Sequence, residues 1–432
     1  MTQAKGVLPR SREETETLYR NPRMCGYFVG VTLRPDLARA AAQRWFQTIS
    51  RHIDELVVRE PPQPNQEKGD KVAAVAVGLS PSFFTANGQA RFSPPIDPPA
   101  GFDLGTADSP NPLVWDSSKL ATVDRVRADV MFYVASIFEA RVARFIERLE
   151  ETGADVAAIT VERGYQRIDG TEPFGYADGV RNIPRGVRSV HVFVQPDSEV
   201  EEPRWADGGS YMTFLRIVQH QESFRQLADD ASRDQVIGRR RDGTRLDLPP
   251  GSDPKHESAE PPPNLPPGSH VRKAGPRGRH DDVQIFRRGL PFMEVVEGRL
   301  RVGLNFASFQ SSLDQFDTVL NDWMLSPNFP VDAAGPDALL DPVRGLTTIE
   351  RIGLYFVPPH DERHVAATLF DTPTLRAREG RLVVRKRVVD PNDPSRRFER
   401  GGFTFRILDS AGQQSGIPSR PPRTDGRYSP DA

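Results

Sequence analysis

The pattern of apolar and polar positions in the first half of the chain predicts a defined order of strands and helices. Apolar runs favour strands at residues 27–33, 71–78, 129–137 and 156–161. Between them, residues 37–56 and 139–151 carry apolar side chains at helical spacing, such as Trp45, Ile49 and Ile53. The order β-α-β-β-α-β is typical of a ferredoxin-like domain, in which helices cover one face of an antiparallel sheet.

The second half repeats this order less clearly. It favours strands at 190–194, 210–218, 300–309 and 352–357, and helices at 221–227, 313–324 and 360–369. The two halves share no repeat at the level of residues. We therefore expect an α+β protein with two ferredoxin-like domains, at 25–165 and 166–371, followed by a C-terminal extension at 372–432.

Two segments fall outside the repeated pattern. Residues 239–268 contain eight prolines and many charges, which predicts a long surface insertion. In the extension, 381–388 and 403–407 could pair as a hairpin, whereas 410–432 is rich in Pro, Ser and Arg and is expected to be disordered.

The overall composition excludes several classes of protein. The 57 basic and 59 acidic residues nearly cancel, which argues against a nucleic-acid partner or a polybasic membrane surface. The single cysteine, Cys25, excludes an internal disulfide and metal sites built from several cysteines. The first residues lack the apolar core of a signal peptide, and no run of about 18 apolar residues occurs. We expect a cytoplasmic protein without a membrane span, and a homo-oligomer is compatible with the sequence.

Three residues in separate segments suggest redox chemistry at a haem. His270 lies in a turn bounded by glycine and proline, Asp178 lies between Ala177 and Gly179, and Arg287 follows an apolar pair. An imidazole can be the axial ligand of haem iron. A carboxylate can carry a proton between the oxygens of hydrogen peroxide, and a guanidinium can stabilise the developing charge. Taken alone, the same residues also fit a turn-capping aspartate and a surface ion pair, so both interpretations stay open.

The segments around these residues resemble those of the dye-decolorizing (DyP-type) peroxidases. Residues 175–179, Gly-Tyr-Ala-Asp-Gly, are similar to the distal motif of that family. Residues 269–277 resemble the segment of its proximal histidine, and 285–289 the segment of its distal arginine. Three further stretches agree in the same order, at 208–218, 236–239 and 303–310. The resemblance covers roughly residues 25–371.

The resemblance implies a haem peroxidase with two ferredoxin-like domains. Haem b would be held mainly by the second domain, with His270 as the iron ligand and Asp178 and Arg287 as catalytic residues. Arg287, Gly179, Leu304 and Phe306 would contact the cofactor. Hydrogen peroxide would be reduced while dyes, phenols and other small aromatic reductants are oxidised. An ordinary aspartate titrates near about pH 4, so the activity is expected to be highest in mildly acidic solution.

The sequence departs from the family at one position, and it is compatible with functions other than a peroxidase. Gly289 stands where one branch of the family has an asparagine, so no role of that asparagine carries over. Within the same fold, the chain could store haem or remove its iron. It could also be a non-catalytic haem-binding module whose inserted loop contacts a partner.

Two further residue sets have a functional and a structural interpretation. His360 and His364, four apart at an expected helix start, could bind zinc, although Asp361 stands where a zinc peptidase has glutamate. Tyr211, Trp323 and Tyr355 could relay electrons to a haem from the surface, but the same residue types build cores, which is the interpretation we favour.

Overall fold

The computed structural model describes residues 24–58, 72–86, 89–102, 105–106, 109–110, 123–183, 187–195, 202–254, 264–275, 283–371, 389–390 and 393–397. The expected hairpin segments 381–388 and 403–407 and the expected disordered tail 410–432 lie outside the described residues. Within the extension, the structure gives two short paired strands, β15 (Val389–Asp390) and β16 (Asp393–Arg397).

The N-terminal half has the predicted ferredoxin-like topology. Its strands pair antiparallel in the spatial order β2-β8-β1-β9, and the chain order is strand, helix, two strands, helix, strand. The six elements are β1 (Cys25–Leu33), α2 (Arg39–Leu56), β2 (Ala73–Leu79), β8 (Val130–Ser136), α4 (Glu139–Glu150) and β9 (Val156–Tyr165). Strands β2 and β8 are buried along their whole length, which explains their continuous apolar sequence.

The C-terminal half repeats that topology around a second antiparallel sheet. Strand β13 lies between β12 and β10, and β10 pairs on its other side with β14. The strands are β10 (Ser210–Gln219), β11 (Phe286–Arg287), β12 (Leu290–Val296), β13 (Arg299–Gln310) and β14 (Thr347–Val357). The helices are α5 (Arg188–Val192), α6 (Gln221–Arg225), α7 (Asp230–Ile237), α8 (His270–Ala274), α9 (Leu313–Asp317), the π-helical η4 (Thr318–Met324) and α10 (Ala367–Asp371).

The remaining short elements lie mainly between β2 and β8. They are α3 (Pro81–Phe84), β3 (Thr85–Ala86), β4 (Gln89–Ala90), η1 (Ala100–Phe102), β5 (Gly105–Thr106), β6 (Ser109–Pro110), β7 (Asp124–Arg125) and, further along the chain, η3 (Arg204–Ala206).

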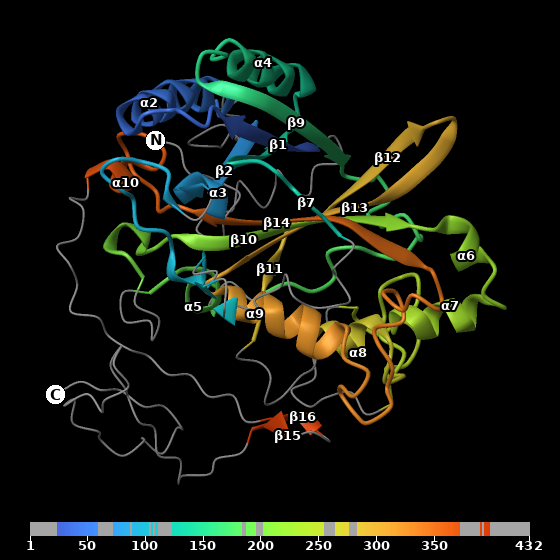
Figure 1. Cartoon of the computed structure of the whole chain (residues 1–432). Coiled ribbons are helices and arrows are strands. Elements are labelled where there is room, and N and C mark those ends of the chain that lie inside the picture. The colour runs from blue at the N-terminus through green and yellow to red at the C-terminus, as the bar shows by residue number, and fades with distance from the viewer. Residues whose placement is uncertain are drawn as a thin grey trace, which may run out of the picture.

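The two halves pack face to face, and their sheets also join at one edge. Phe28 of the first sheet lies 4.7 Å from Phe214 of the second between ring centroids, and Tyr133 lies 6.3 Å from Phe309. The join at the edge is an antiparallel pairing of Phe356 with Leu79. Helices α2 and α4 cover the outer face of the first sheet, and α8 and α9 lie on the opposite side of the molecule, beyond the second sheet (Figure 1).

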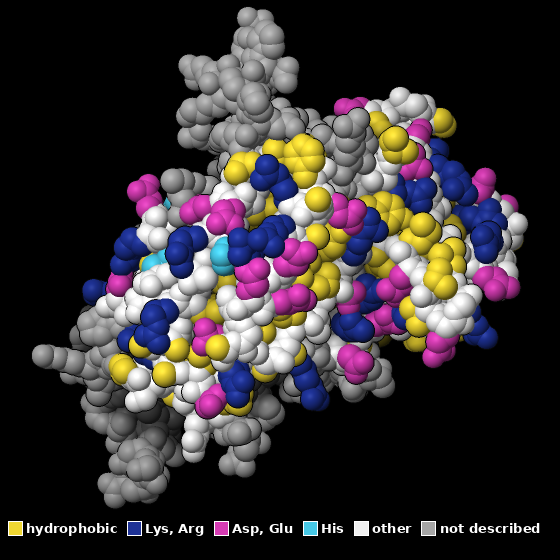
Figure 2. Space-filling view, turned by 90° about the horizontal axis from the view of Figure 1, so that it is seen from above, with side chains coloured by type: hydrophobic (Ala, Val, Ile, Leu, Met, Phe, Trp, Pro, Cys, Tyr) yellow, Lys and Arg dark blue, Asp and Glu magenta, His cyan; other side chains and the backbone are white. Residues whose placement is uncertain are grey.

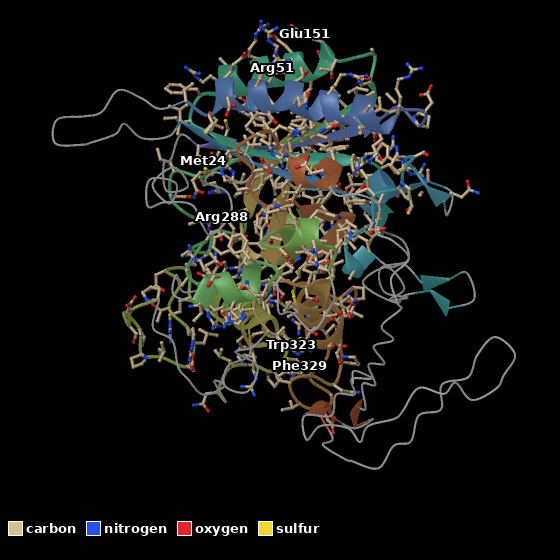
Figure 3. The ribbon with its side chains drawn as sticks, turned by 90° about the vertical axis from the view of Figure 1, so that its left-hand side faces the viewer. Met24, Arg51, Glu151, Arg288, Trp323 and Phe329 are labelled. Carbon is tan, nitrogen blue, oxygen red and sulfur yellow. The ribbon has the colours of Figure 1, made fainter. Side chains whose placement is uncertain are left out.

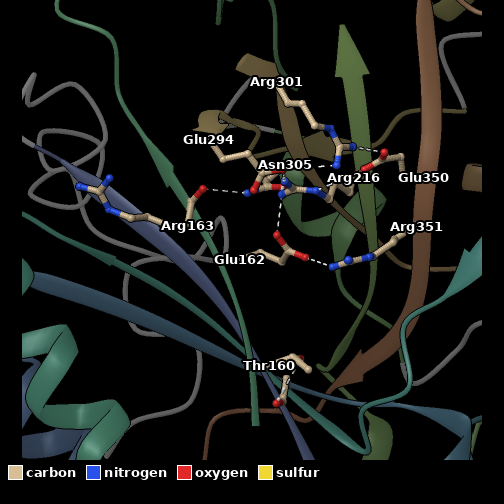
Figure 4. A network of polar contacts seen from close by, with 10 residues as sticks. Thr160, Glu162, Arg163, Arg216, Glu294, Arg301, Asn305, Glu350 and Arg351 are labelled. Atoms are coloured by element: carbon tan, nitrogen blue, oxygen red, sulfur yellow. Dashed lines mark hydrogen bonds and ion pairs between the residues drawn. The ribbon is translucent and has the colours of Figure 1, made fainter. Parts of the chain in front are cut away.

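A buried arginine joins the two halves beside this packing. Arg216 of β10 contacts Glu162 of β9 at 2.5 Å and Glu294 of β12 at 2.6 Å, and its guanidinium lies 3.8 Å from the centroid of the Phe292 ring (Figure 4). Its side chain is only 4 % exposed. Glu162 also pairs with Arg351 of β14, whose side chain is 48 % exposed. The charges are therefore paired across the domain boundary.

Several predicted elements of the second half were wrong. Residues 190–194 were expected to form a strand, but 188–192 form α5, because the His191 carbonyl accepts hydrogen bonds from the Ser311 N–H and the Gln315 side chain. The last helix begins at Ala367 rather than at 360. Strand β12 was not predicted, because only Leu290, Pro291 and Phe292 of it are buried.

The expected surface insertion 239–268 was partly wrong as well. Arg239, Thr244 and Arg245 are buried, and Arg239 and Arg245 form an isolated β-bridge. Arg245 is charge-paired with Asp247 at 2.5 Å, which allows its guanidinium to be buried. This part of the segment packs into the protein, and its high polarity reflects internal pairing.

The outer surface shows no strong charge bias where it can be seen. Basic and acidic side chains are interspersed over the face that carries α2 and α4 (Figure 2), in keeping with the formal net charge of −2. Within the described residues, no helix is both long and apolar enough to cross a lipid bilayer.

Candidate functional site

The outer face of the second sheet carries three of the predicted site residues. Side chains alternate along β13, so Leu304, Phe306 and Ser308 point to one face and Asn305, Ala307 and Phe309 to the other. Arg287 of β11 pairs directly with Ser308 and so shares its face. Leu304 and Phe306 are partly exposed although they lie in the middle of the sheet.

The backbone of Arg287 is fixed by Asn182. The Asn182 side-chain oxygen accepts the Arg287 N–H at 3.2 Å, and its amide nitrogen donates to the Arg287 carbonyl at 2.8 Å. The Arg287 guanidinium donates to the carbonyl of Arg181. A single side chain thus ties the loop that follows Asp178 to β11. Sequence reasoning missed Asn182, because its partner lies 105 residues away.

Hydrogen bonds to the Glu172 side chain stabilise the loop that carries Asp178. The Glu172 carboxylate accepts the N–H groups of Phe174 and Tyr176, at 2.9 and 3.0 Å, and the Gln219 amide at 2.6 Å. Gly175 has a φ of 89°, a conformation that favours glycine. Desolvation raises the pKa of Glu172. The loop keeps this partly buried acid because its carboxylate accepts hydrogen bonds from the backbone of the turn.

Asp178 lies close enough to Arg287 for their charges to interact. Desolvation raises the pKa of Asp178, while the Gly179 N–H at 2.6 Å and the charge of Arg287 oppose that rise. Asp178 is nevertheless accessible to solvent. Gly179 has a φ of 66°, and a Cβ built there would meet no atom within 4 Å, so the space beside this residue is open.

His270 begins helix α8, on a different element from Asp178 and Arg287. Its Nδ1 lies 2.8 Å from Oδ2 of Asp337, whose side chain is 0 % exposed, whereas the His270 side chain is 32 % exposed. Asp337 is itself held, because its Oδ1 accepts the Leu339 N–H at 2.9 Å. With Nδ1 engaged in this way, Nε2 is the nitrogen that can bind a metal. Sequence reasoning missed Asp337, an isolated aspartate after Gly335 and Pro336.

The end of η4 supports both members of this pair. Lys273, one turn after His270 and fully buried, donates to the carbonyls of Trp323 and Ser326 at 3.2 and 2.5 Å. The Asp337 N–H donates to the Met324 carbonyl at 2.6 Å. Trp323 stacks on Phe329 with centroids 5.4 Å apart, and both lie below the sheets, away from α2 and α4 (Figure 3). The imidazole therefore projects from a well-anchored turn.

Packing against Leu304 explains why position 289 is a glycine. A Cβ at this position would lie 2.8 Å from Cδ2 of Leu304, one of the candidate cofactor contacts. A side chain here would displace Leu304, so the structure accounts for glycine at this place.

The alternative metal site does not form. His364 is buried, its Nδ1 lies 2.9 Å from the Val365 carbonyl, and both histidines precede α10, so they do not share a helix face. Among the described residues, no group of three or more His, Cys, Asp or Glu side chains is placed to hold a metal ion.

The three candidate relay aromatics are all internal. Tyr211, Trp323 and Tyr355 are 1 %, 4 % and 0 % exposed, so the favoured interpretation as core residues is correct and none of them is a surface site.

Comparisons with known proteins agree with the fold. Residues 171–362 match the family described as "Dyp-type peroxidase, C-terminal". A dye-decolorizing peroxidase of Mycetinis scorodonius is 23 % identical over 235 residues, which cover 40 % of this chain and 46 % of that protein, so the match spans less than half of the relative.

Solved structures share the fold over most of the chain. Ferric DtpA from Streptomyces lividans has a TM-score of 0.61 and 20 % identity, covering 82 % of this chain and 94 % of that one. A DyP-type peroxidase from Cellulomonas bogoriensis has a TM-score of 0.56 and 21 % identity, covering 81 % and 94 %. Residues 171–362 thus match the C-terminal part of the Dyp-type peroxidase family, and the chain shares the fold of solved DyP-type peroxidases over most of its length.

Proposed function

We propose that the chain is a haem-dependent peroxidase that reduces hydrogen peroxide and oxidises dyes, phenols and similar one-electron donors. We further propose domain limits of 25–165 and 166–371, with haem b held by the second domain. The observation that carries the proposal is the His270–Asp337 pair, because a partly exposed imidazole held by a fully buried carboxylate is typical of a metal ligand.

The residues present fit a flat, apolar group bound on the outer face of the second sheet. Leu304 and Phe306 offer partly exposed apolar surface, and Gly179 leaves open space beside Asp178. A planar macrocycle of that kind needs apolar contact on its faces and one nitrogen directed at its metal. His270 Nε2 would hold the iron. Bound haem would supply a metal that coordinates peroxide and takes up its oxidising equivalents.

Asp337 would set the orientation and the electronic character of His270. By accepting the Nδ1 hydrogen, it fixes the tautomer that leaves Nε2 unprotonated, and it increases electron donation by the imidazole. Because Asp337 is fixed by the Leu339 N–H and through its own N–H, the ring cannot turn away.

Asp178 and Arg287 would divide the work on the peroxide. The Asp178 carboxylate would accept the proton from one oxygen and return it to the departing oxygen, so that water leaves. The Arg287 guanidinium, which donates to the Arg181 carbonyl, would stabilise negative charge as the oxygen–oxygen bond breaks. The raised pKa of Asp178 suits this role, because a carboxyl must release the proton as readily as it accepts it.

The experiment that tests this function is haem reconstitution followed by peroxide. We expect a Soret band in the wild-type protein, its loss in His270→Ala, a spectral change on adding peroxide, and oxidation of 2,6-dimethoxyphenol, a phenol with which one structural neighbour was solved. Haem binding without peroxide-dependent oxidation would favour storage or a binding module. Release of iron from an intact macrocycle would favour iron removal.

A further inference from the structure

The hairpin formed by β12 and β13 exposes a concentration of apolar side chains. Among the described residues, eleven large apolar side chains are exposed, and four of them lie between positions 293 and 300, namely Met293, Val295, Val296 and Leu300. The hairpin extends outward from the second sheet, away from the helices (Figure 1). Single apolar residues on a surface are ordinary, whereas a cluster of this kind indicates a surface that contacts a partner.

Three of these side chains share one face of the hairpin with Val302. Met293 pairs with Val302, and Val295 pairs with Leu300, and side chains of directly paired residues lie on the same face. Met293, Val295 and Leu300 are between 57 % and 69 % exposed, and Val302 is partly buried. No charged residue of either strand shares this face. We call these four residues the apolar face.

The opposite face of the hairpin is charged, and its charges are matched within the protein. Glu294 contacts Arg216 at 2.6 Å. Arg301 lies 3.7 Å from Glu294 and also pairs with Glu350 of β14 (Figure 4). These contacts anchor the back of the hairpin to the second sheet. The apolar face is therefore held in position before any partner binds, which lowers the entropic cost of association.

The absence of charge on the apolar face favours a second copy of this chain as the partner. A charged partner surface would lose its hydration without gaining a counter-charge. A second copy presents the same uncharged face, and a two-fold rotation brings the two faces together without opposing like charges. Four side chains of this size offer on the order of 300 Å² of apolar surface, below the roughly 800 Å² per partner of a stable complex. The area therefore fits a weak dimer that depends on concentration.

We infer that two copies of this chain associate through the apolar face, which packs against itself about a two-fold axis. Val295, the most exposed of the four side chains, lies near the axis and close to the partner's Val295. The dissociation constant is about micromolar or weaker, as expected for a contact of this size. The inference concerns association of the chain and does not rest on the proposed reaction with peroxide.

The test is sedimentation velocity of the full chain at concentrations from below to well above micromolar. We expect the wild type to shift from monomer to dimer as its concentration rises. Val295→Lys should lower the association constant about 10-fold or more, because two like charges would enter an uncharged contact. Val343→Lys is the matched control, since Val343 is 92 % exposed and lies outside the hairpin, and it should associate like the wild type.

A charge-swap experiment tests the face itself. Val295→Lys and Val295→Glu should each remain monomeric alone, because each places like charges near the axis. Their equimolar mixture should form a dimer, because opposite charges then meet across the contact. A mixture that stays monomeric would contradict the placement of Val295 at the axis and, with it, the inference.

The remaining outcomes also decide the matter. A wild type that is monomeric at every concentration, or a Val295→Lys variant that associates like the wild type, overturns the inference. If the wild type is monomeric and Val295→Lys raises the KM for 2,6-dimethoxyphenol, the apolar face binds small aromatic molecules and not a second copy.

Discussion

Nδ1 of His270 lies 2.8 Å from Oδ2 of Asp337, a fully buried carboxylate 67 residues further along the chain. The contact links α8 to the loop that follows η4, and it determines which imidazole nitrogen faces a ligand.

We expect Asp337→Ala to weaken haem binding about 10- to 100-fold, because loss of a carboxylate behind a ligating histidine usually has this effect. Haem titration followed at the Soret band measures it. Asp332→Ala, at an exposed position in the same loop, is the control and should bind haem like the wild type. Equal affinity of both variants would show that Asp337 does not support the ligand.

The Arg216 network makes a prediction about stability. Arg216→Ala should cost about 3–5 kcal/mol in the free energy of unfolding, because Glu162 and Glu294 lose the buried charge that they contact. Arg351→Ala removes another partner of Glu162, but from a half-exposed position, and should cost about 0–1 kcal/mol. Urea denaturation of the two variants compares them. Similar losses would mean that burial is not what makes Arg216 important.

The parts of the fold that the sequence predicted are those whose local pattern matches their final environment. Strands β2 and β8 are continuous apolar runs because both of their faces are buried, and α2 shows one apolar stripe. The segment that became α5 is a short apolar run, which periodicity cannot assign. Its helical form depends on contacts with Ser311 and Gln315 from more than 100 residues away.

The residues of the candidate site also fall into those that the sequence predicted and those that it did not. Asp178, His270 and Arg287 lie within recognisable motifs, whereas Asn182 and Asp337 act through partners distant in sequence. The electrostatics of Asp178 could not be predicted either, because the pKa of its carboxyl depends on the desolvation and the neighbouring charge that the folded chain supplies. An ordinary aspartate was the basis for expecting an acidic optimum, and the raised pKa moves that expectation towards neutrality.

The rate of the reaction with peroxide should therefore fall in acidic solution, as Asp178 becomes protonated. The carboxylate form accepts the proton, and desolvation raises the pKa of this group, so the rate should rise with pH through a value above about 4. Stopped-flow measurement between pH 4 and 8 gives the profile. The rate of Asp178→Asn should not show this dependence on pH. A variant that keeps it would assign the titration to another group.

The raised pKa of Asp178 also predicts that the folded protein becomes more stable when the charge of this side chain is removed. Below the ordinary pKa of aspartate, the carboxyl is protonated in both the folded and the unfolded chain. As pH rises through the raised folded pKa, folding requires a desolvated carboxylate, and stability is lost. Thermal unfolding of haem-free protein should show Asp178→Asn melting above the wild type at pH 7, with the difference shrinking towards pH 4. A wild type that is more stable than the variant at pH 7 would contradict the direction of the shift.

The last prediction separates Asp178 from Arg287. Loss of a fixed charge-stabilising donor typically slows a reaction about 10²- to 10³-fold, and loss of a proton carrier about 10²- to 10⁴-fold, so these ranges do not rank the two residues. A water molecule can replace the carboxylate in moving a proton, but it cannot replace the cation. Asn182 binds the backbone of Arg287, so Arg287→Leu should leave β11 in place while removing the charge.

We therefore expect Arg287→Leu to slow the reaction with peroxide at least as much as Asp178→Asn, in stopped-flow traces with haem fully loaded. Arg288→Leu is the matched control, because it removes the neighbouring arginine by the same substitution. The Arg288 guanidinium lies 4.2 Å from the centroid of the Phe286 ring. If Arg287→Leu reacts like the wild type while Arg288→Leu is inactive, the charge that stabilises the reacting oxygen belongs to Arg288. The assignment of Arg287 would then be wrong.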